Sequence, residues 1–192
     1  MKEVERPQTD QHNESNLPGV FLVGEVIGAA LIKKAVNQGD QTVRYIGNRK
    51  PRIAEAQYDV IIVGAGPGGL AAGLEAKRLG LRYLILERES IASTIQNYPR
   101  DKAVLAEPVL LSIYGLLPMM DAKKETLVGL WEDIVRKSDL QVNIREEVTE
   151  VKKVDNLFTV TTVKGSYQAA YVVLATGTRG NPRKIVGSVR CV

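Results

Sequence analysis

Short apolar runs alternate with amphipathic segments along the chain, and this alternation predicts a mixed α/β fold. Residues 58–63 (YDVIIV) are rich in β-branched side chains and precede a glycine loop, which is typical of a buried parallel strand. Residues 67–79 predict a helix that Gly80 ends, and residues 83–86 (YLIL) predict the next strand. This strand–helix–strand order indicates a βαβ unit in a parallel sheet.

The second half of the chain predicts one helix followed by four strands. Residues 122–137 are amphipathic, with Trp131 on the apolar face, where we expect it in the core. Polar turn residues separate the last three strand-like runs, which predicts a three-stranded β-meander. Residues 91–120 predict a long connection, and a loop of this length in a compact domain is usually functional.

The front of the chain is predicted to contain a polar segment followed by one strand and one helix. Residues 1–18 are polar and lack periodicity, which predicts a flexible lead-in. Residues 19–24 (GVFLVG) predict a buried strand, and we expect its apolar residues to pair in parallel beside residues 172–175. The pattern from Val26 to Gln38 predicts a helix that Gly39-Asp40 kinks or ends, with residues 41–47 as a further turn or two.

Composition limits the classes of function. Contents of 44% hydrophobic and 25% charged residues are typical of a soluble globular protein, so a cytoplasmic location is the default. The net charge of +4 is mild and the basic residues are scattered, so we expect no nucleic-acid partner. Residues 21–32 form the longest apolar run, but it contains Glu25 and is too short to span a bilayer, so we expect no membrane partner. A lone Cys191 and a lone His12 predict no disulfide, iron–sulfur or metal site.

The clearest chemical signal is the loop after the first strand of the βαβ unit. It matches G-x-G-x-x-G and comprises Gly64, Ala65, Gly66, Pro67, Gly68 and Gly69. Gly64 permits the tight turn, Gly66 lets the backbone approach a pyrophosphate, and Gly69 lets helix and strand pack closely. The helix that opens at Pro67 offers this pyrophosphate unpaired N–H groups and a positive dipole end.

Two charged residues follow the next strand. Glu87 stands at the spacing expected of the acid that binds the adenosine ribose. Arg88 alone would suggest a 2′-phosphate, but Glu87 would repel that group, so NADP is disfavoured at this site. NAD and FAD both stay open on these residues. An NAD-binding dehydrogenase domain and a non-catalytic dinucleotide-binding module are therefore both kept as alternatives to an FAD-binding domain.

The last predicted strand ends in Ala175, Thr176 and Gly177. With the glycine loop, Glu87 and the meander, this ATG sequence makes residues 19–183 similar to the flavoproteins with two dinucleotide-binding domains, the superfamily of glutathione reductase and thioredoxin reductase. The resemblance implies a Rossmann-like FAD/NAD(P)-binding domain with a central parallel sheet and crossover helices. It also implies FAD as the cofactor of a pyridine-nucleotide-dependent oxidoreductase.

The resemblance further implies roles for particular residues. The glycine loop would bind FAD, Glu87 would hold the adenosine ribose, and the backbone around Val148 would contact the adenine. The ATG sequence would close over the cofactor. Residues 19–36 are similar to a late Gly-Asp segment of the family, with Gly24-Glu25 in its place, so Glu25 would face the ribityl chain. No catalytic residue is identified, and the substrate stays open.

The order of the segments is unusual for that family, in which the Gly-Asp segment follows the ATG strand and an inserted NAD(P)H domain. Here the segment comes first, and the sequence has one G-x-G-x-x-G loop. A circular permutation and a fragment of a tandem flavoprotein both explain this order. An NAD(P)H-binding domain is then expected in the same parent protein or in a partner chain. The expected division is a lead-in (1–18), a closing strand–helix segment (19–47), a linker (48–57), an FAD-binding domain (58–183) and a truncated tail (184–192).

Overall fold

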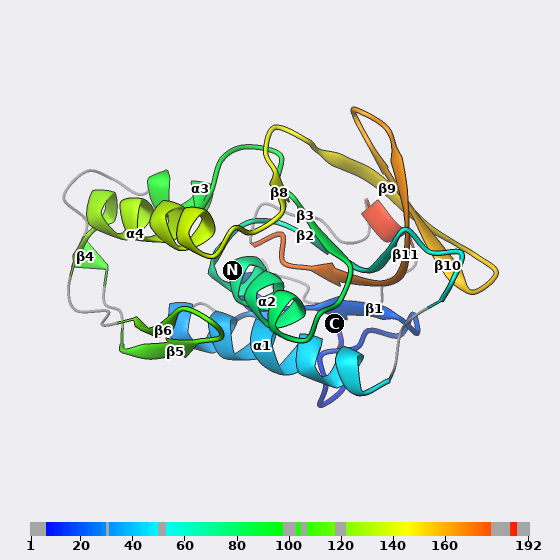
Figure 1. Cartoon of the computed structure of the whole chain (residues 1–192), viewed down its shortest axis with the longest axis horizontal. Helices are drawn as coiled ribbons and strands as arrows, with labels where there is room; N and C mark the ends of the chain where they lie inside the picture. Colours follow the sequence, from blue (N-terminus) through cyan, green and yellow to red (C-terminus); the bar gives the residue numbers. More distant parts are fainter. Residues whose placement is uncertain are drawn as a thin grey trace, which may run out of the picture.

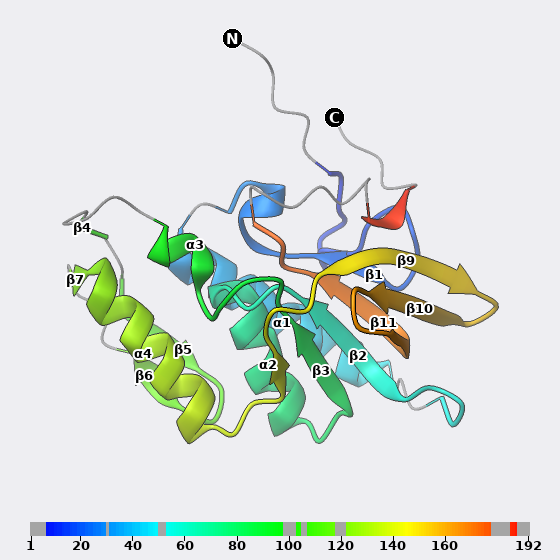
Figure 2. The same ribbon diagram turned by 90° about the horizontal axis from the view of Figure 1, so that it is seen from above.

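The computed structural model describes residues 7–29, 31–49, 53–97, 103–104, 107–117, 122–177 and 185–187. Parallel strands form its centre (Figures 1 and 2), in the order β1 (Val20–Leu22), β11 (Ser166–Leu174), β2 (Tyr58–Val63), β3 (Tyr83–Leu86) and β8 (Val142–Asn143). An antiparallel meander of β9 (Val148–Val154), β10 (Leu157–Thr162) and β11 continues the sheet. The predicted α/β class, parallel sheet and meander are confirmed.

The long strand β11 joins the two parts of the sheet. Its first residues pair with β10, whereas Val172, Val173 and Leu174 pair with β1 on the same side. The front strand β1 thus fills the position that β10 leaves open along the second half of β11. The parallel pairing that the sequence predicts for the front strand is confirmed.

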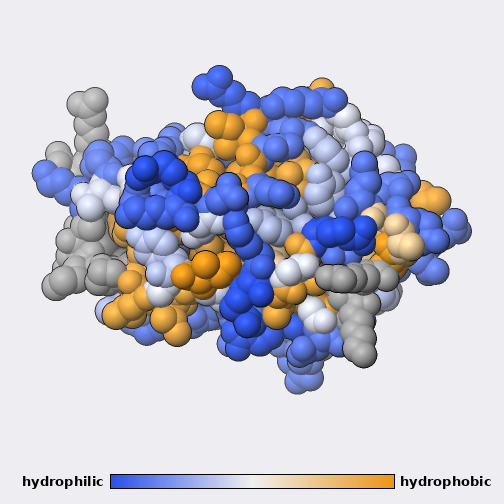
Figure 3. Space-filling model, in the orientation of Figure 1, coloured by the Kyte–Doolittle hydropathy of each residue, from blue (hydrophilic) through white to orange (hydrophobic). Residues whose placement is uncertain are grey.

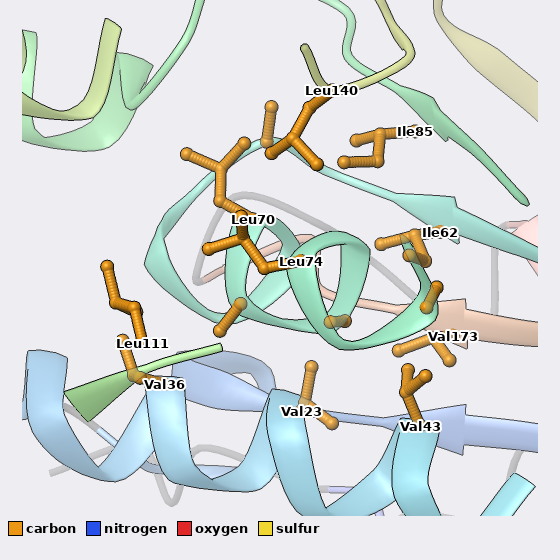
Figure 4. Close-up of a cluster of buried hydrophobic side chains, with 14 of the residues drawn as sticks. Val23, Val36, Val43, Ile62, Leu70, Leu74, Ile85, Leu111, Leu140 and Val173 are labelled. Carbon is orange, nitrogen blue, oxygen red and sulfur yellow. The ribbon is translucent and has the colours of Figure 1, made fainter. Parts of the chain in front are cut away.

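The central strands are covered on both faces, which explains their continuous apolar runs. Helices α1 (Ile32–Asn48) and α2 (Pro67–Arg78) pack on one face, where the core includes Val36, Val43, Leu70, Ile62 and Val173 (Figure 4). The meander curls over the other face, where alternate strand residues such as Ile61 and Leu174 meet Phe158 and Val160. Side chains of successive strand residues therefore enter two different cores.

Helix α1 differs from the prediction at both of its ends. A 3₁₀ turn, η1 (Gly24–Ile27), precedes it and ends at Gly28, whose φ of 87° breaks the helical path. Helix α1 then runs through Gly39 without ending there. Gly39 lies at the crossing with α2, where a Cβ atom would stand 2.1 Å from the carbonyl oxygen of Gly68. The glycine is thus a packing residue. The expected helix is present, but it begins at Ile32 rather than at Val26 and does not end at Gly39-Asp40.

The long connection contains more regular structure than its sequence predicts. Its described parts are α3 (Ser93–Gln96), β4 (Ala103–Val104) and a hairpin of β5 (Val109–Leu111) and β6 (Gly115–Leu117), before β7 (Ala122–Lys123) and α4 (Lys124–Lys137). The hairpin buries Leu111 and Leu117 but exposes Leu110, Ile113 and Leu116, and apolar residues gather over it (Figure 3). In α4, Trp131 is fully buried, as predicted.

The polar segment before β1 packs against α1. The Asn13 amide donates to Thr42 Oγ1 at 3.0 Å, and the Glu14 carboxylate accepts the Gly19 N–H at 2.7 Å. The His12 ring stacks on Tyr45 at 3.9 Å. The sequence predicts a flexible lead-in here from its polar composition and lack of periodicity, whereas His12, Asn13 and Glu14 make specific contacts.

Two negative findings apply to the described residues alone. None of their helices is long and apolar enough to cross a membrane. Their His, Cys, Asp and Glu side chains form no group of three that could hold a metal ion.

A buried carboxylate joins α1, α2 and the hairpin. The side chain of Glu75 on α2 has no exposed surface, and it accepts hydrogen bonds from Arg78 Nε at 2.7 Å and Ser112 Oγ at 2.6 Å. Arg44 of α1 lies 3.3 Å away. Burial raises the pKa of Glu75, but the hydrogen bonds from Arg78 and Ser112 and the charges of Arg78 and Arg44 outweigh it and lower the pKa to about 2.

This network predicts acid sensitivity. Because the folded-state pKa of Glu75 lies below its unfolded value, its contribution to stability is complete above about pH 5 and is lost as the pH falls toward 2. Glu75→Gln should lower the free energy of unfolding at pH 7 by about 1–3 kcal/mol, less than for a fully buried pair because both arginines are half-exposed. Urea denaturation between pH 7 and 3 should show a flatter pH dependence for this variant. Glu55→Gln, at an exposed position, is the control, and equal pH dependence in both variants would contradict the assignment.

Candidate dinucleotide-binding site

A cavity of about 400 Å³ lies at the carboxyl ends of the parallel strands. Its lining includes Val23 after β1, Gly64 after β2, Glu87 after β3 and Ala175 after β11. Ligands of open α/β sheets bind at this edge, where loops from neighbouring strands converge. The volume lies within the range of small-molecule sites.

The cavity brings together almost all of the residues that the sequence singles out. Its lining includes Gly24, Glu25, Gly64, Gly66, Pro67, Gly68, Glu87, Arg88, Val148, Ala175, Thr176 and Gly177. Gly69 is absent from the lining, because it is buried against the strand behind the loop. Residues from both ends of the described chain thus meet at one place. Tyr98 and Arg100 of the long connection, and the lone Cys191, lie outside the described residues.

The three glycines of the loop have different surroundings. A Cβ atom at Gly69 would stand 1.9 Å from the Gly64 carbonyl oxygen, and one at Gly64 would stand 2.4 Å from the Ala175 carbonyl oxygen. Both positions therefore require glycine for packing. A Cβ atom at Gly66 would meet nothing within 4 Å, and its φ of −81° suits any residue. Neither packing nor backbone conformation explains this third glycine.

The start of α2 lies in the cavity wall and has no acidic residue in its first turn. Gly66 is its N-cap and Pro67 its first residue, and no side chain caps this end or places a negative charge in the first turn. The first N–H groups of a helix have no acceptor within the helix. Together with the helix dipole, they make this part of the cavity wall suited to an anion.

Glu87 supplies a buried carboxylate opposite the loop. Its Oε2 accepts the Ala65 N–H at 2.7 Å and its Oε1 accepts the Glu89 N–H at 2.8 Å, and the residue is 7% exposed. A carboxylate has about four acceptor positions, so these two bonds leave capacity for hydroxyl donors. Glu87 therefore holds the loop and retains an acceptor surface at the cavity.

The segment before β2 forms one wall of the cavity. Gly24 adopts a φ of 82°, and its N–H donates to the Gln38 side chain of α1 at 2.9 Å. This bond fixes η1 against α1 and places the partly exposed Glu25 in the lining, with Ile32 and Ala35 of α1 beside it. The front segment and the glycine loop thus face the same space.

Other lining residues receive no individual assignment from the sequence. Ser93, Thr94 and Ile95 come from α3, within the connection whose length already suggested function. Glu146, Glu147 and Thr149 lie around the start of β9. The only sequence feature that could have indicated them is the pair of glutamates that follows the predicted strand. The Thr176 hydroxyl is buried and has no hydrogen-bond partner among the described residues, so it is free to bond to a ligand.

This arrangement defines the class of the protein: a Rossmann-like domain with a cavity of the dinucleotide-binding kind. A family model described as pyridine nucleotide-disulphide oxidoreductase matches residues 61–190. The chain belongs to this family, whose thioredoxin-reductase-like members are FAD-dependent. Strand β1, the turn η1 and helix α1 lie before the matched residues.

Curated relatives and solved structures agree with this family. Thioredoxin reductase of Treponema pallidum is 34% identical over 139 residues, which are 69% of this chain and 39% of the relative. Bacilliredoxin reductase Bdr of Bacillus subtilis is 28% identical over 130 residues, 66% of this chain and 40% of the relative. The structure of bacillithiol disulfide reductase Bdr from Staphylococcus aureus aligns with a TM-score of 0.57 and 32% identity, covering 62% of this chain and 38% of that one. The chain therefore spans less than half the length of these relatives.

The glycine geometry makes a stability prediction that needs no ligand. Gly69→Ala should lower the free energy of unfolding by about 1–3 kcal/mol or more, because its Cβ atom must push helix α2 away from Gly64. Gly66→Ala should cost less than about 1 kcal/mol, the scale of an N-cap change, because its Cβ atom meets open space. Urea denaturation of the two variants measures the difference. Equal losses would show that Gly66, too, is required for packing.

Proposed function

We propose that this cavity binds FAD and that the chain is the flavin-binding part of a pyridine-nucleotide-dependent oxidoreductase. The observation that carries the proposal is Gly66. The protein itself has no atom near the missing side chain, yet the position lies in the cavity wall at the start of α2. A ligand backbone or phosphate pressed against this residue accounts for the glycine, because any side chain would project into that ligand.

The adenosine half of FAD fits the side of the cavity that holds Glu87. The α2 N-terminus would face the pyrophosphate with free N–H groups, and the first turn of α2 contains no acidic residue. Glu87 retains acceptor positions for the ribose hydroxyls, and the nearby Val148 offers an apolar contact for the adenine. Glu87 would also repel a 2′-phosphate beside Arg88, which favours FAD over NADP at this site.

The flavin half would then lie toward the front segment and the end of β11. Thr176 provides an unpartnered hydroxyl, and Gly24 and Glu25 line the cavity between β1 and α1. We propose that Glu25 faces the ribityl chain in place of the shorter aspartate of the family. When bound, FAD supplies the redox chemistry, and the residues of this chain bind it, orient it and exclude water.

The electron donor and the substrate must bind at sites other than this cavity. The sequence has one G-x-G-x-x-G loop, which the proposal assigns to FAD. We propose that a second nucleotide-binding domain, in the parent protein or in a partner chain, brings NADH or NADPH to the flavin. We also propose that residues 19–47 act as the closing segment of the domain formed by residues 58–183.

Flavin content of the purified chain tests the proposal. Gly66→Val should abolish most FAD binding, because its branched side chain occupies the space of the pyrophosphate, while the fold persists. The visible absorbance of the flavin measures bound FAD, and circular dichroism measures the fold. Gly129→Val is the control, since Gly129 is exposed on α4 and also has open space around it.

Two outcomes would overturn the proposal. Unchanged FAD content in Gly66→Val would remove the loop from the site. Binding of NAD without FAD by the parent chain would favour the NAD-binding dehydrogenase domain instead.

A further inference from the structure

The carboxylate of Glu146 is buried beside the proposed adenosine end of the cavity, and the proposed function leaves it without a role. Its side chain is 3% exposed. The residue lies between β8 and β9, where the chain passes from the edge of the parallel sheet to the meander. Glu146 also belongs to the cavity lining, together with Val148 and Glu87.

Hydrogen bonds from several strands converge on this carboxylate. Its Oε1 accepts Tyr167 OH at 2.7 Å and Thr162 Oγ1 at 2.8 Å, and its Oε2 accepts the Asn143 side-chain amide at 3.1 Å. Lys164 Nζ lies 3.9 Å from Oε2. Burial raises the pKa of Glu146, but these hydrogen bonds and the charge of Lys164 outweigh it and lower the pKa. The ionised group thus ties β8, β10 and β11 together.

The backbone around Glu146 is bonded directly to the backbone around Glu87. The Glu146 N–H donates to the Glu87 carbonyl at 2.8 Å, and the Glu87 N–H donates to the Asn143 carbonyl at 2.8 Å. The Arg145 N–H also donates to the Glu89 carbonyl, although Arg145 has a φ of 53°. A non-glycine residue in this left-handed region costs energy, which the anchored carboxylate next to it can offset.

We propose that Glu146 is a positioning residue that sets the adenosine half of the binding site, by fixing the segment from Asn143 to Thr149 against Glu87. The inference rests on the proposed function, because the ligand it concerns is FAD. The proposed effect of Glu146 is limited to the adenosine end of the cavity. The proposed flavin end is formed by Gly24, Glu25 and Thr176. The Gly24 N–H donates to Gln38 of α1, and the Thr176 hydroxyl has no partner among the described residues, so neither bonds to the Glu146 network.

The test uses ADP as a probe of the adenosine half and FAD as a probe of the whole site. Glu146→Gln keeps the size of the side chain but removes its charge, so the hydrogen bonds from Tyr167 and Thr162 weaken. Calorimetric titration should then show about tenfold weaker binding of ADP and FAD, the scale of one lost charge-assisted hydrogen bond. The absorption spectrum of FAD bound at saturation should not change, because the flavin end is untouched.

Two further variants serve as a control and as an independent test of the Glu146 hydrogen bonds. Glu150→Gln removes the same charge from a half-exposed position on β9 and should leave both affinities unchanged. Tyr167→Phe deletes one donor to Glu146 and should weaken ADP binding in the same direction by a smaller factor, with little risk to the fold.

The outcomes separate this inference from the proposed function. Failure of the parent chain to bind FAD would overturn both. Binding of FAD by the parent chain, with unchanged ADP affinity in Glu146→Gln and Tyr167→Phe, would overturn the role of Glu146 alone. A changed spectrum of the bound flavin would also overturn it, because the effect would then reach beyond the adenosine half.

Discussion

Close contact between backbone segments at three glycines determines the shape of the site. Gly69 brings α2 against the turn at Gly64, Gly64 brings that turn against the end of β11, and Gly39 brings α1 against α2 at Gly68. A Cβ atom at any of these three positions would stand within 2.4 Å of a carbonyl oxygen. Because these contacts hold α1, α2 and β11 together, the free N–H groups of α2 and the Thr176 hydroxyl face one cavity.

The front segment is part of this arrangement although it lies before the residues that match the family model. Strand β1 completes the parallel sheet beside β11, and α1 covers the same face as α2. Gly24 and Glu25 consequently line the same cavity as the glycine loop. The position of a segment in space, rather than its order along the chain, decides whether it contributes to the cavity.

Much of this fold was predictable from local patterns. The glycine loop, Glu87 and the ATG sequence each carry a spacing or a strand end that points to the same edge of the sheet, and they do line one cavity. Gly39 was interpreted as a kink or an end of the helix, because a glycine that permits a helix crossing looks the same in sequence as one that interrupts a helix. The network of Glu146 was not predictable, since Asn143, Thr162 and Tyr167 meet it only through the pairing of strands. The packing of residues 7–18 was not predictable either, because it depends on polar contacts that leave no periodic pattern in the sequence.

The central claim is that β1 and α1 close a flavin site formed by the glycine loop of the same chain. A crystal structure of the chain soaked with FAD tests it most directly. The account predicts a pyrophosphate against Gly66 and Gly68, with Gly24 and Glu25 of the same chain beside the flavin half. FAD bound elsewhere, or a β1–α1 segment seated on a neighbouring molecule instead, would contradict it.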